Sequence, residues 1–211
     1  MKRSIIRNIA VLLLTIPVTA NSQDFQKADA SPESSARLNA EADTGDPARQ
    51  YVIAMKYYYG RGVDRDYAEA MKWLRLSAAK GNAGAEHGIG YMYQKGLGVM
   101  QDYAEAMKWY RLAAEKGNMA AEDNIGVLYE HGYGVGQDYA EAMRWYLISA
   151  AKGNGEAELN IGNFYQHGLG VERDLNKAMK WLQSAASKGN AEAAQKIRAI
   201  NGGSGQVAQH E

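Results

Sequence analysis

Two serine–lysine pairs have the spacing at which a serine can act as an acyl-enzyme nucleophile. They are Ser77 with Lys80 and Ser149 with Lys152, and both match the S-x-x-K arrangement of enzymes that react with penicillin. The S-D-N and K-T-G sequences that accompany this arrangement do not occur in the chain. At the equivalent positions elsewhere the lysine recurs without the serine, as Ala113 with Lys116 and Ala185 with Lys188. We therefore interpret the lysine as a helix-terminus residue and expect no catalytic residue.

Two histidines occupy equivalent positions, but a metal site would need a third ligand beside them. The acid next to His131 is Glu130, whereas the residue next to His167 is Gln166. A cationic histidine is favourable at the C-terminus of a helix through the helix dipole, so we assign both to helix ends. The chain has no cysteine, which excludes disulfides, thiolate metal sites and cysteine nucleophiles. We expect no metal and no cofactor.

A hexapeptide repeat determines the architecture that positions these residues. Asp-Tyr-Ala-Glu-Ala-Met begins at residues 66, 102 and 138, which are 36 residues apart, and a weaker copy begins at Asp174. A fixed period of this length is typical of arrays in which each helical unit packs on its neighbours. Such an array presents a long surface rather than one deep pocket, so the repeat favours binding over catalysis.

Each unit contains the signals of two helices. The first is predicted over 83–95 and ends at Gly96, which suits a left-handed C-cap. The second begins after Asp102, which forms with Glu105 an arrangement resembling a capping box. The second helix ends at the sequence Lys-Gly-Asn, in which lysine suits the negative end of the helix dipole and asparagine can cap the next helix.

Tryptophan and methionine recur at the repeat period and are predicted to lie in the core. The tryptophans are Trp73, Trp109, Trp145 and Trp181. Their spacing could also describe an aromatic ladder for a ligand. We favour packing, because a helix held between two neighbours needs a wide apolar arc.

The complete pattern is A-x-x-x-[LI]-G-x-x-Y-x-x-G-x-G-V, followed by D-Y-x-x-A-x-x-W-x-x-x-A-A-x-x-G. In the second unit it is carried by Ala85, Ile89, Gly90, Tyr93, Gly96, Gly98, Val99, Asp102, Ala106, Trp109, Ala113, Ala114 and Gly117. The pattern resembles the Sel-one-like repeat (SLR) family, a relative of tetratricopeptide repeats. The resemblance implies an all-α fold, a right-handed α-solenoid (superhelix) of antiparallel helix pairs with 36-residue repeats. It also implies that the first helices line a concave face and that protein–protein binding is the usual activity.

Binding is predicted where the repeats differ on an exposed face, because the constant positions serve packing. Positions 87, 91 and 94 vary between units and are spaced so that they share one side of the first helix. The predicted partner-binding set on the concave face is Tyr51, Met55, Tyr58, Tyr59, His87, Tyr91, Gln94, Asp123, Val127, Glu130, Leu159, Asn163 and Gln166. Tyrosine and methionine are enriched at binding surfaces. The alternative is that some of these tyrosines only cover the core.

The ends of the chain predict export. Residues 1–20 have the basic start, apolar run and small residues of a signal peptide cleaved after Ala20. Residues 21–45 are predicted to be a polar lead-in with a degenerate capping helix over 31–44, residues 46–200 the solenoid with a terminal cap helix over 191–200, and residues 201–211 a disordered tail. Without Lys2, Arg3 and Arg7, the 24 basic residues fall to 21 against 24 acidic, a net charge of −3. This charge argues against a nucleic-acid or anionic-membrane partner.

Together these features predict a non-enzymatic module that binds a protein or peptide segment in its concave groove. We expect it to be exported, to the periplasm or outside the cell, without membrane insertion after signal cleavage. Two alternatives remain open at this level. One is a protein that binds or hydrolyses cell-wall fragments or β-lactams, and the other is an immunity or antitoxin-like partner of one exported protein.

Overall fold

The computed structural model describes residues 36, 40 and 45–207. The expected signal peptide, nearly all of the expected capping helix over 31–44, and residues 208–211 therefore lie outside the described residues. Within the described part, the chain forms nine α-helices and no strands. Their bounds are α2 Pro47–Tyr59, α3 Tyr67–Ala78, α4 Ala83–Lys95, α5 Tyr103–Glu115, α6 Met119–His131, α7 Tyr139–Ala151, α8 Gly155–His167, α9 Leu175–Ser187 and α10 Ala191–Val207.

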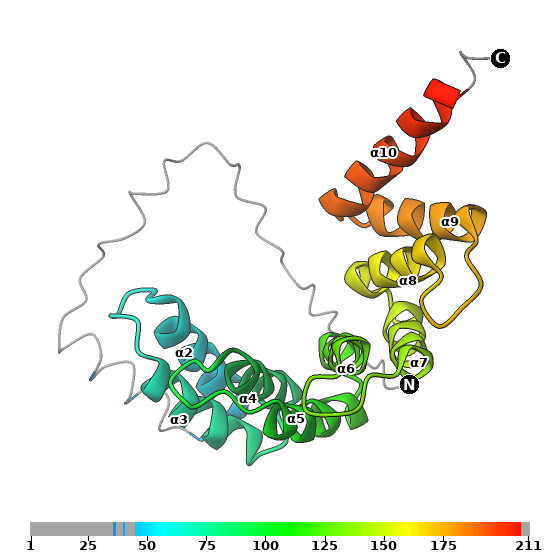
Figure 1. The fold of residues 1–211 in the computed structure, drawn as a ribbon. Helices are drawn as coiled ribbons and strands as arrows, with labels where there is room; N and C mark the ends of the chain where they lie inside the picture. The colour runs from blue at the N-terminus through cyan, green and yellow to red at the C-terminus, as the bar shows by residue number, and fades with distance from the viewer. Residues whose placement is uncertain (1–35, 37–39, 41–44, 208–211) are drawn as a thin grey trace, which may run out of the picture.

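The helices form the predicted α-solenoid of antiparallel pairs. Each helix packs on the helix before it and the helix after it, and the pairs α2–α3, α4–α5, α6–α7 and α8–α9 follow one another along an arc (Figure 1). The first helices α4, α6 and α8 lie on the inner side of this arc, and the second helices α5, α7 and α9 lie on the outer side (Figure 1). None of the helices in the described part combines the length and apolar character that crossing a bilayer requires.

The predicted caps set where the helices begin and end. The Asp102 side chain accepts a hydrogen bond from the backbone N–H of Glu105 at 2.9 Å. Gly96 ends α4 in the left-handed conformation, with φ of 68°, which costs a glycine little. The reciprocal half of the capping box is absent from this pair. Glu105 accepts instead from Lys108 and from the indole N–H of Trp109, and the backbone N–H of Asp102 donates to the carbonyl of Tyr93.

In the three units from α4 to α9, the centre is one large side chain on the second helix against a glycine on the first. Tyr110 and Tyr146 are fully buried. A methyl group on Gly126 would lie 2.6 Å from the Tyr146 ring, so only glycine permits this approach. The same pairing joins Gly90 to Tyr110.

The tryptophans are less buried than predicted, and they connect units. Trp73 is 4% exposed, whereas Trp109, Trp145 and Trp181 are half-buried. Trp109 packs against a cluster of buried residues that joins the preceding pair, α2 and α3, to α4 of its own pair. The prediction of a packing role is therefore correct, but the fully buried position is the next residue along the helix, which is Tyr110 in this unit.

A buried glutamate in each of three units is paired with the lysine that follows the second helix. The pairs are Glu86 with Lys116, Glu122 with Lys152, and Glu158 with Lys188. The Glu122 side chain is 3% exposed and the Lys152 side chain 39% exposed. The lysine therefore does more than interact with its own helix end, because it neutralises a carboxylate on the antiparallel partner helix.

The C-terminal helix is longer than predicted. Residues 201–207 were expected to belong to a disordered tail, but α10 continues from Ala191 to Val207. A helix that has already begun gains one hydrogen bond for each residue it adds, so propagation can carry it through several weak helix formers.

Replacing Gly126 with alanine should destabilise the protein by about 1–3 kcal/mol, because the added methyl group overpacks the contact with Tyr146. Urea denaturation followed by circular dichroism measures the effect. Gly136→Ala is the matched control, since a Cβ there would meet nothing within 4 Å and the residue has no positive φ. Equal midpoints for the two variants would contradict the prediction.

Replacing Lys152 with methionine should lower the free energy of unfolding by about 1–3 kcal/mol, because it leaves the buried Glu122 carboxylate without its cation. Adding Glu122→Gln should recover part of the loss. The control is Lys108→Met, which breaks the more exposed pair with Glu105 and should cost clearly less, because exposed ion pairs contribute little to stability. A loss as large in the control would show that burial of the carboxylate is unimportant.

Candidate functional site

The two S-x-x-K pairs do not form a nucleophile with its base. The Ser77 hydroxyl donates to the carbonyl of Pro47 at 2.6 Å, and the Ser149 hydroxyl donates to the carbonyl of Met119 at 2.7 Å. Both serines are completely buried. Their lysines are bonded elsewhere: Lys80 contacts the carbonyl of Gly45, and Lys152 contacts Glu122. These serines act as polar links between neighbouring segments of the backbone.

The two histidines lie at helix ends, as predicted, because His131 is the last residue of α6 and His167 the last residue of α8. His131 is exposed, its Nδ1 lies 3.1 Å from the carbonyl oxygen of Val127, and its ring stacks on Tyr133. Across the described residues, no group of three or more His, Asp or Glu side chains is placed to hold a metal ion.

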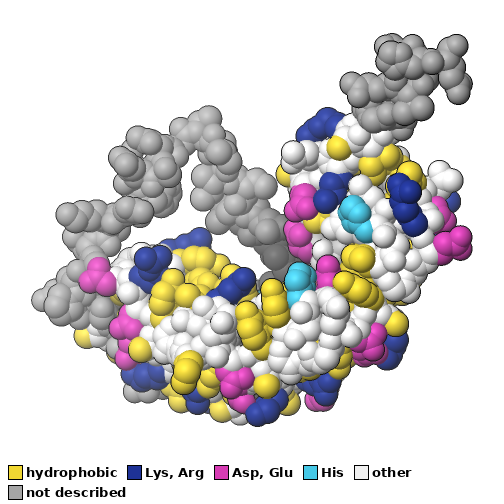
Figure 2. Space-filling view, in the orientation of Figure 1, with side chains coloured by type: hydrophobic (Ala, Val, Ile, Leu, Met, Phe, Trp, Pro, Cys, Tyr) yellow, Lys and Arg dark blue, Asp and Glu magenta, His cyan; other side chains and the backbone are white. Residues whose placement is uncertain are grey.

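Six residues of the predicted partner-binding set line one hollow on the inner side of the arc. Its lining consists of Tyr51, Met55, Tyr58, Tyr59, His87, Gly88 and Tyr91, and its volume is about 210 Å³. We call it the α2–α4 pocket, since both helices supply its walls. Hydrophobic surface lies over this end of the arc, with basic side chains at its margin (Figure 2). A cavity of about 150 Å³ can hold a benzene ring, so the pocket has room for one large apolar side chain.

The walls of the α2–α4 pocket are neutral. Burial, together with the neighbouring Tyr91, Tyr59 and Tyr67, raises the pKa of Tyr58 to about 12. Burial also lowers the pKa of His87 below its usual value. At pH 7 the pocket therefore offers protonated tyrosine hydroxyls and a neutral imidazole, which suits an apolar guest with a few hydrogen-bonding atoms.

Cations lie on two rings of the pocket. The Arg61 guanidinium carbon is 4.7 Å from the centroid of the Tyr59 ring, and the Lys95 Nζ is 5.8 Å from the centroid of the Tyr91 ring. These cation–π interactions contribute about 0.5–1 kcal/mol each at exposed sites, so they hold the two cations only weakly near the rings.

The middle of the inner face is acidic. Asp123 accepts a hydrogen bond from the Asn160 side chain at 3.1 Å, which joins α6 to α8. Burial, together with the negative charges of Glu156 and Glu130, raises the pKa of Asp123 to about 6, although the hydrogen bond from Asn160 acts in the opposite direction. Glu130 accepts from the Tyr146 hydroxyl at 2.5 Å and Val127 is half-buried beside it, so part of this stretch also covers the core.

Two residues of the predicted set are buried and unavailable to a partner. Gln94 is 7% exposed and its side-chain oxygen accepts from the Tyr110 hydroxyl, while Leu159 is 3% exposed and packs in the core with Leu182. Asn163 and Gln166 are half-buried on α8, and each has a side-chain oxygen for which the described residues supply no partner. Sequence variation between units therefore did not predict the exposure of Gln94 and Leu159, because the side chains packed against them, Tyr110 and Leu182, also differ between units.

The sequence pattern missed three residues of the pocket region. Gly88 forms part of the wall, and Arg61 and Lys95 approach the rings. A signal for the cations was present, because the positions equivalent to Arg61 hold Leu97, Tyr133 and Leu169 in the other units. A charged residue at a turn position that is leucine or tyrosine in the other units is therefore a sequence signal for this part of the site.

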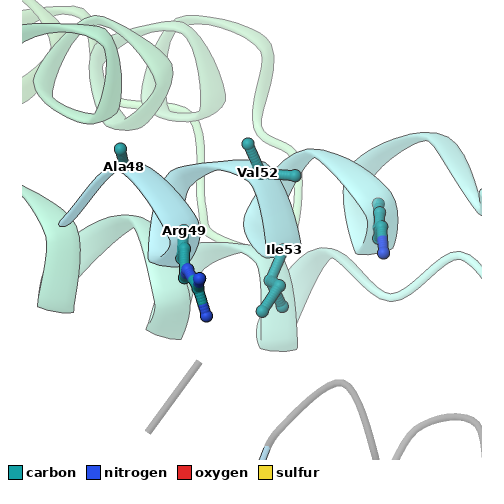
Figure 3. Close-up of a pocket in the computed structure, with 5 residues that line it drawn as sticks. Ala48, Arg49, Val52 and Ile53 are labelled. Carbon is teal, nitrogen blue, oxygen red and sulfur yellow. The ribbon is translucent and has the colours of Figure 1, made fainter. Parts of the chain in front are cut away.

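Two larger hollows lie at the ends of the array and are each lined by one helix. The first, of about 420 Å³, lies on α2 against Ala48, Arg49, Val52, Ile53 and Lys56 (Figure 3). The second, of about 560 Å³, lies on α10 against Ala191, Glu192, Gln195, Lys196 and Ala199. A single helix face has no opposing wall, so we regard the α2–α4 pocket as the better site despite its smaller volume.

A family model and solved structures both identify the same repeat in this chain. The family model for the Sel1 repeat matches residues 50–82, 83–118, 120–154 and 155–190. Among solved structures, a Sel1 repeat protein from Oxalobacter formigenes is 37% identical with a TM-score of 0.72, and the match covers 77% of this chain and 66% of that protein. No protein with a curated description matches the chain.

Two further structures show how widely the fold is used. A protective antigen of uropathogenic Escherichia coli strains, which displays an SLR fold, is 35% identical with a TM-score of 0.72 over 78% of this chain and 35% of that protein. This chain therefore spans about a third of the antigen's length. An immunity protein from Pseudomonas aeruginosa is 20% identical with a TM-score of 0.55, covering 84% of this chain and 74% of that protein, a likeness of fold alone.

The four matched segments cover most of the solenoid, and each corresponds to all or most of one helix pair of the structure. Proteins of this family are generally non-catalytic modules of protein interaction. The chain belongs to the Sel1 repeat family.

Proposed function

We propose that this protein binds a partner polypeptide along its inner face and holds it through an apolar side chain in the α2–α4 pocket. The observation that carries the proposal is the convergence of four tyrosines, His87 and Met55 on one hollow. These side chains come from two successive first helices, and Tyr59 remains 57% exposed. Large aromatic side chains left open to solvent are the usual anchors of protein interfaces.

The size of the pocket sets the scale of the interaction. Burial of one leucine or phenylalanine side chain contributes about 1.5–3 kcal/mol, which is roughly a ten- to hundredfold change in Kd. The remaining affinity must come from the rest of the inner face. A partner that lies along several units fits this requirement, because a solenoid exposes a continuous surface rather than one cavity.

The two alternative functions receive no specific support. A serine acyl-enzyme would need Ser77 or Ser149 to be accessible, and both are buried donors to carbonyl oxygens. The likeness to an immunity protein is one of fold at 20% identity, so it does not favour that role over another binding function.

We also propose that the protein acts in the cell envelope or outside the cell. The support is the amino-acid sequence of residues 1–20, with its basic start, apolar run and Val18-Thr19-Ala20.

The binding surface can be tested by placing a photo-crosslinking residue at Tyr91 in the protein expressed in its native cells. We expect a crosslinked partner band from position 91 and none from Leu112, an exposed side chain on α5 that serves as the control. In a separate pull-down without the crosslinking residue, Tyr58→Ala with Tyr91→Ala should lower partner capture about ten- to hundredfold. Equal crosslinking from both positions would contradict the assignment of the inner face.

Export can be tested by the intact mass of the protein recovered from its native cells. We expect the mature chain to begin at Asn21, because signal peptidase cleaves after a small residue such as Ala20. Recovery of a cytosolic chain that retains residues 1–20 would contradict the proposal.

A further inference from the structure

We propose that the inner face is polarised by charge and selects an extended segment with a defined pattern. The segment carries an apolar side chain next to an acidic side chain, followed about three residues later by a basic side chain. The apolar group enters the α2–α4 pocket, the acid meets Arg61 and Lys95, and the base meets the acidic stretch of α6. This inference rests on the proposed function and adds to it the chemistry of the partner.

The cations beside the pocket are free to meet an acid. Arg61 and Lys95 are exposed, and neither takes part in any ion pair among the described residues. They are also particular to this end of the groove. The positions equivalent to Lys95 hold Tyr59, His131 and His167, and those equivalent to Arg61 hold Leu97, Tyr133 and Leu169, so no other unit has a lysine or arginine at either position.

The acidic stretch lacks a cation in the same way. Asp123, Glu130 and Glu156 form no ion pair within the described part of the chain, and their like charges act on one another. The positions equivalent to Asp123 hold His87 and Leu159. A basic side chain of a partner would relieve this repulsion, whereas an acidic one would add to it.

The pocket and the acidic stretch are adjacent. His87 lines the pocket, and its Nε2 lies 3.0 Å from the side-chain nitrogen of Asn124, the residue after Asp123. This contact holds α4 and α6 side by side, at a spacing of roughly 10 Å between helices that touch, and an extended chain advances about 3.3 Å per residue. A segment that crosses from α4 to α6 therefore places about three residues between its apolar anchor and its basic group.

The charges set the direction of the segment more than its affinity. Each exposed ion pair changes binding by about two- to fivefold, but a reversed segment brings like charges together at both ends. The difference between the two orientations should therefore exceed the contribution of either pair alone.

Two peptides of identical composition test the inference by NMR titration of the mature chain. The first contains Asp-Leu-Gly-Ser-Arg within a Gly-Ser host, and the second contains Arg-Leu-Gly-Ser-Asp in the same host. We expect at least a fivefold lower Kd for the first, with shifts at Tyr58, Tyr91 and Asp123. The preference should disappear or invert in Arg61→Glu with Lys95→Glu, and it should persist in Lys180→Glu, an exposed charge reversal on α9.

The outcomes separate this inference from the proposed function. Equal binding of both peptides, lost in Tyr58→Ala with Tyr91→Ala, would overturn the charge rule and leave the groove in place. Binding of neither peptide would also overturn the charge rule, whereas the crosslinking result at Tyr91 stands or fails independently of it. Shifts confined to the outer helices would overturn both. A third peptide, Arg-Ser-Gly-Leu with a free C-terminal carboxylate, tests whether the anion that meets Arg61 and Lys95 is a chain terminus. If it binds more tightly than the first peptide, the acidic side chain in the proposed pattern is wrong and a C-terminal carboxylate takes its place.

Discussion

The whole array depends on how closely the two helices of a unit can approach each other. Because Gly126 has no side chain, the Tyr146 ring can lie against the backbone of α6. The ring is then fully buried, and its hydroxyl reaches Glu130 on the inner face. One contact thus joins the core to the surface, because the group that fills the interior also holds a side chain of the groove. Loss of this approach would separate the helices and alter the inner face at the same time.

Much of the fold could be predicted because its signals are local. Asp102 caps a helix through an N–H three residues away, and Gly96 ends one through its own φ, so short windows of sequence contain the cause. The buried pairing of Glu122 with Lys152 could not be found this way, since the partners are 30 residues apart and each looks like an ordinary surface charge. Only the antiparallel packing of two helices brings them together.

The site was predictable in part for a related reason. Tyr58 and Tyr91 vary from the repeat and do lie in the pocket, because α2 and α4 turn the side of the helix that carries them toward each other. Gln94 lies on the same helical side as Tyr91 but is bonded to Tyr110, which comes from another helix. Position along a helix therefore determines the direction in which a side chain points. Whether a partner can reach that side chain depends on the size of the residue that packs against it from the neighbouring helix.

The glutamate–lysine pairs have a consequence for how such a protein can change over generations. Both members of each pair belong to the same helix hairpin, as in Glu122 with Lys152. Duplication or deletion of one complete 36-residue segment in the gene therefore leaves no carboxylate stranded without its ammonium group. The number of hairpins can grow or shrink in whole steps, and the reach of the molecule along an elongated target changes by the same increments.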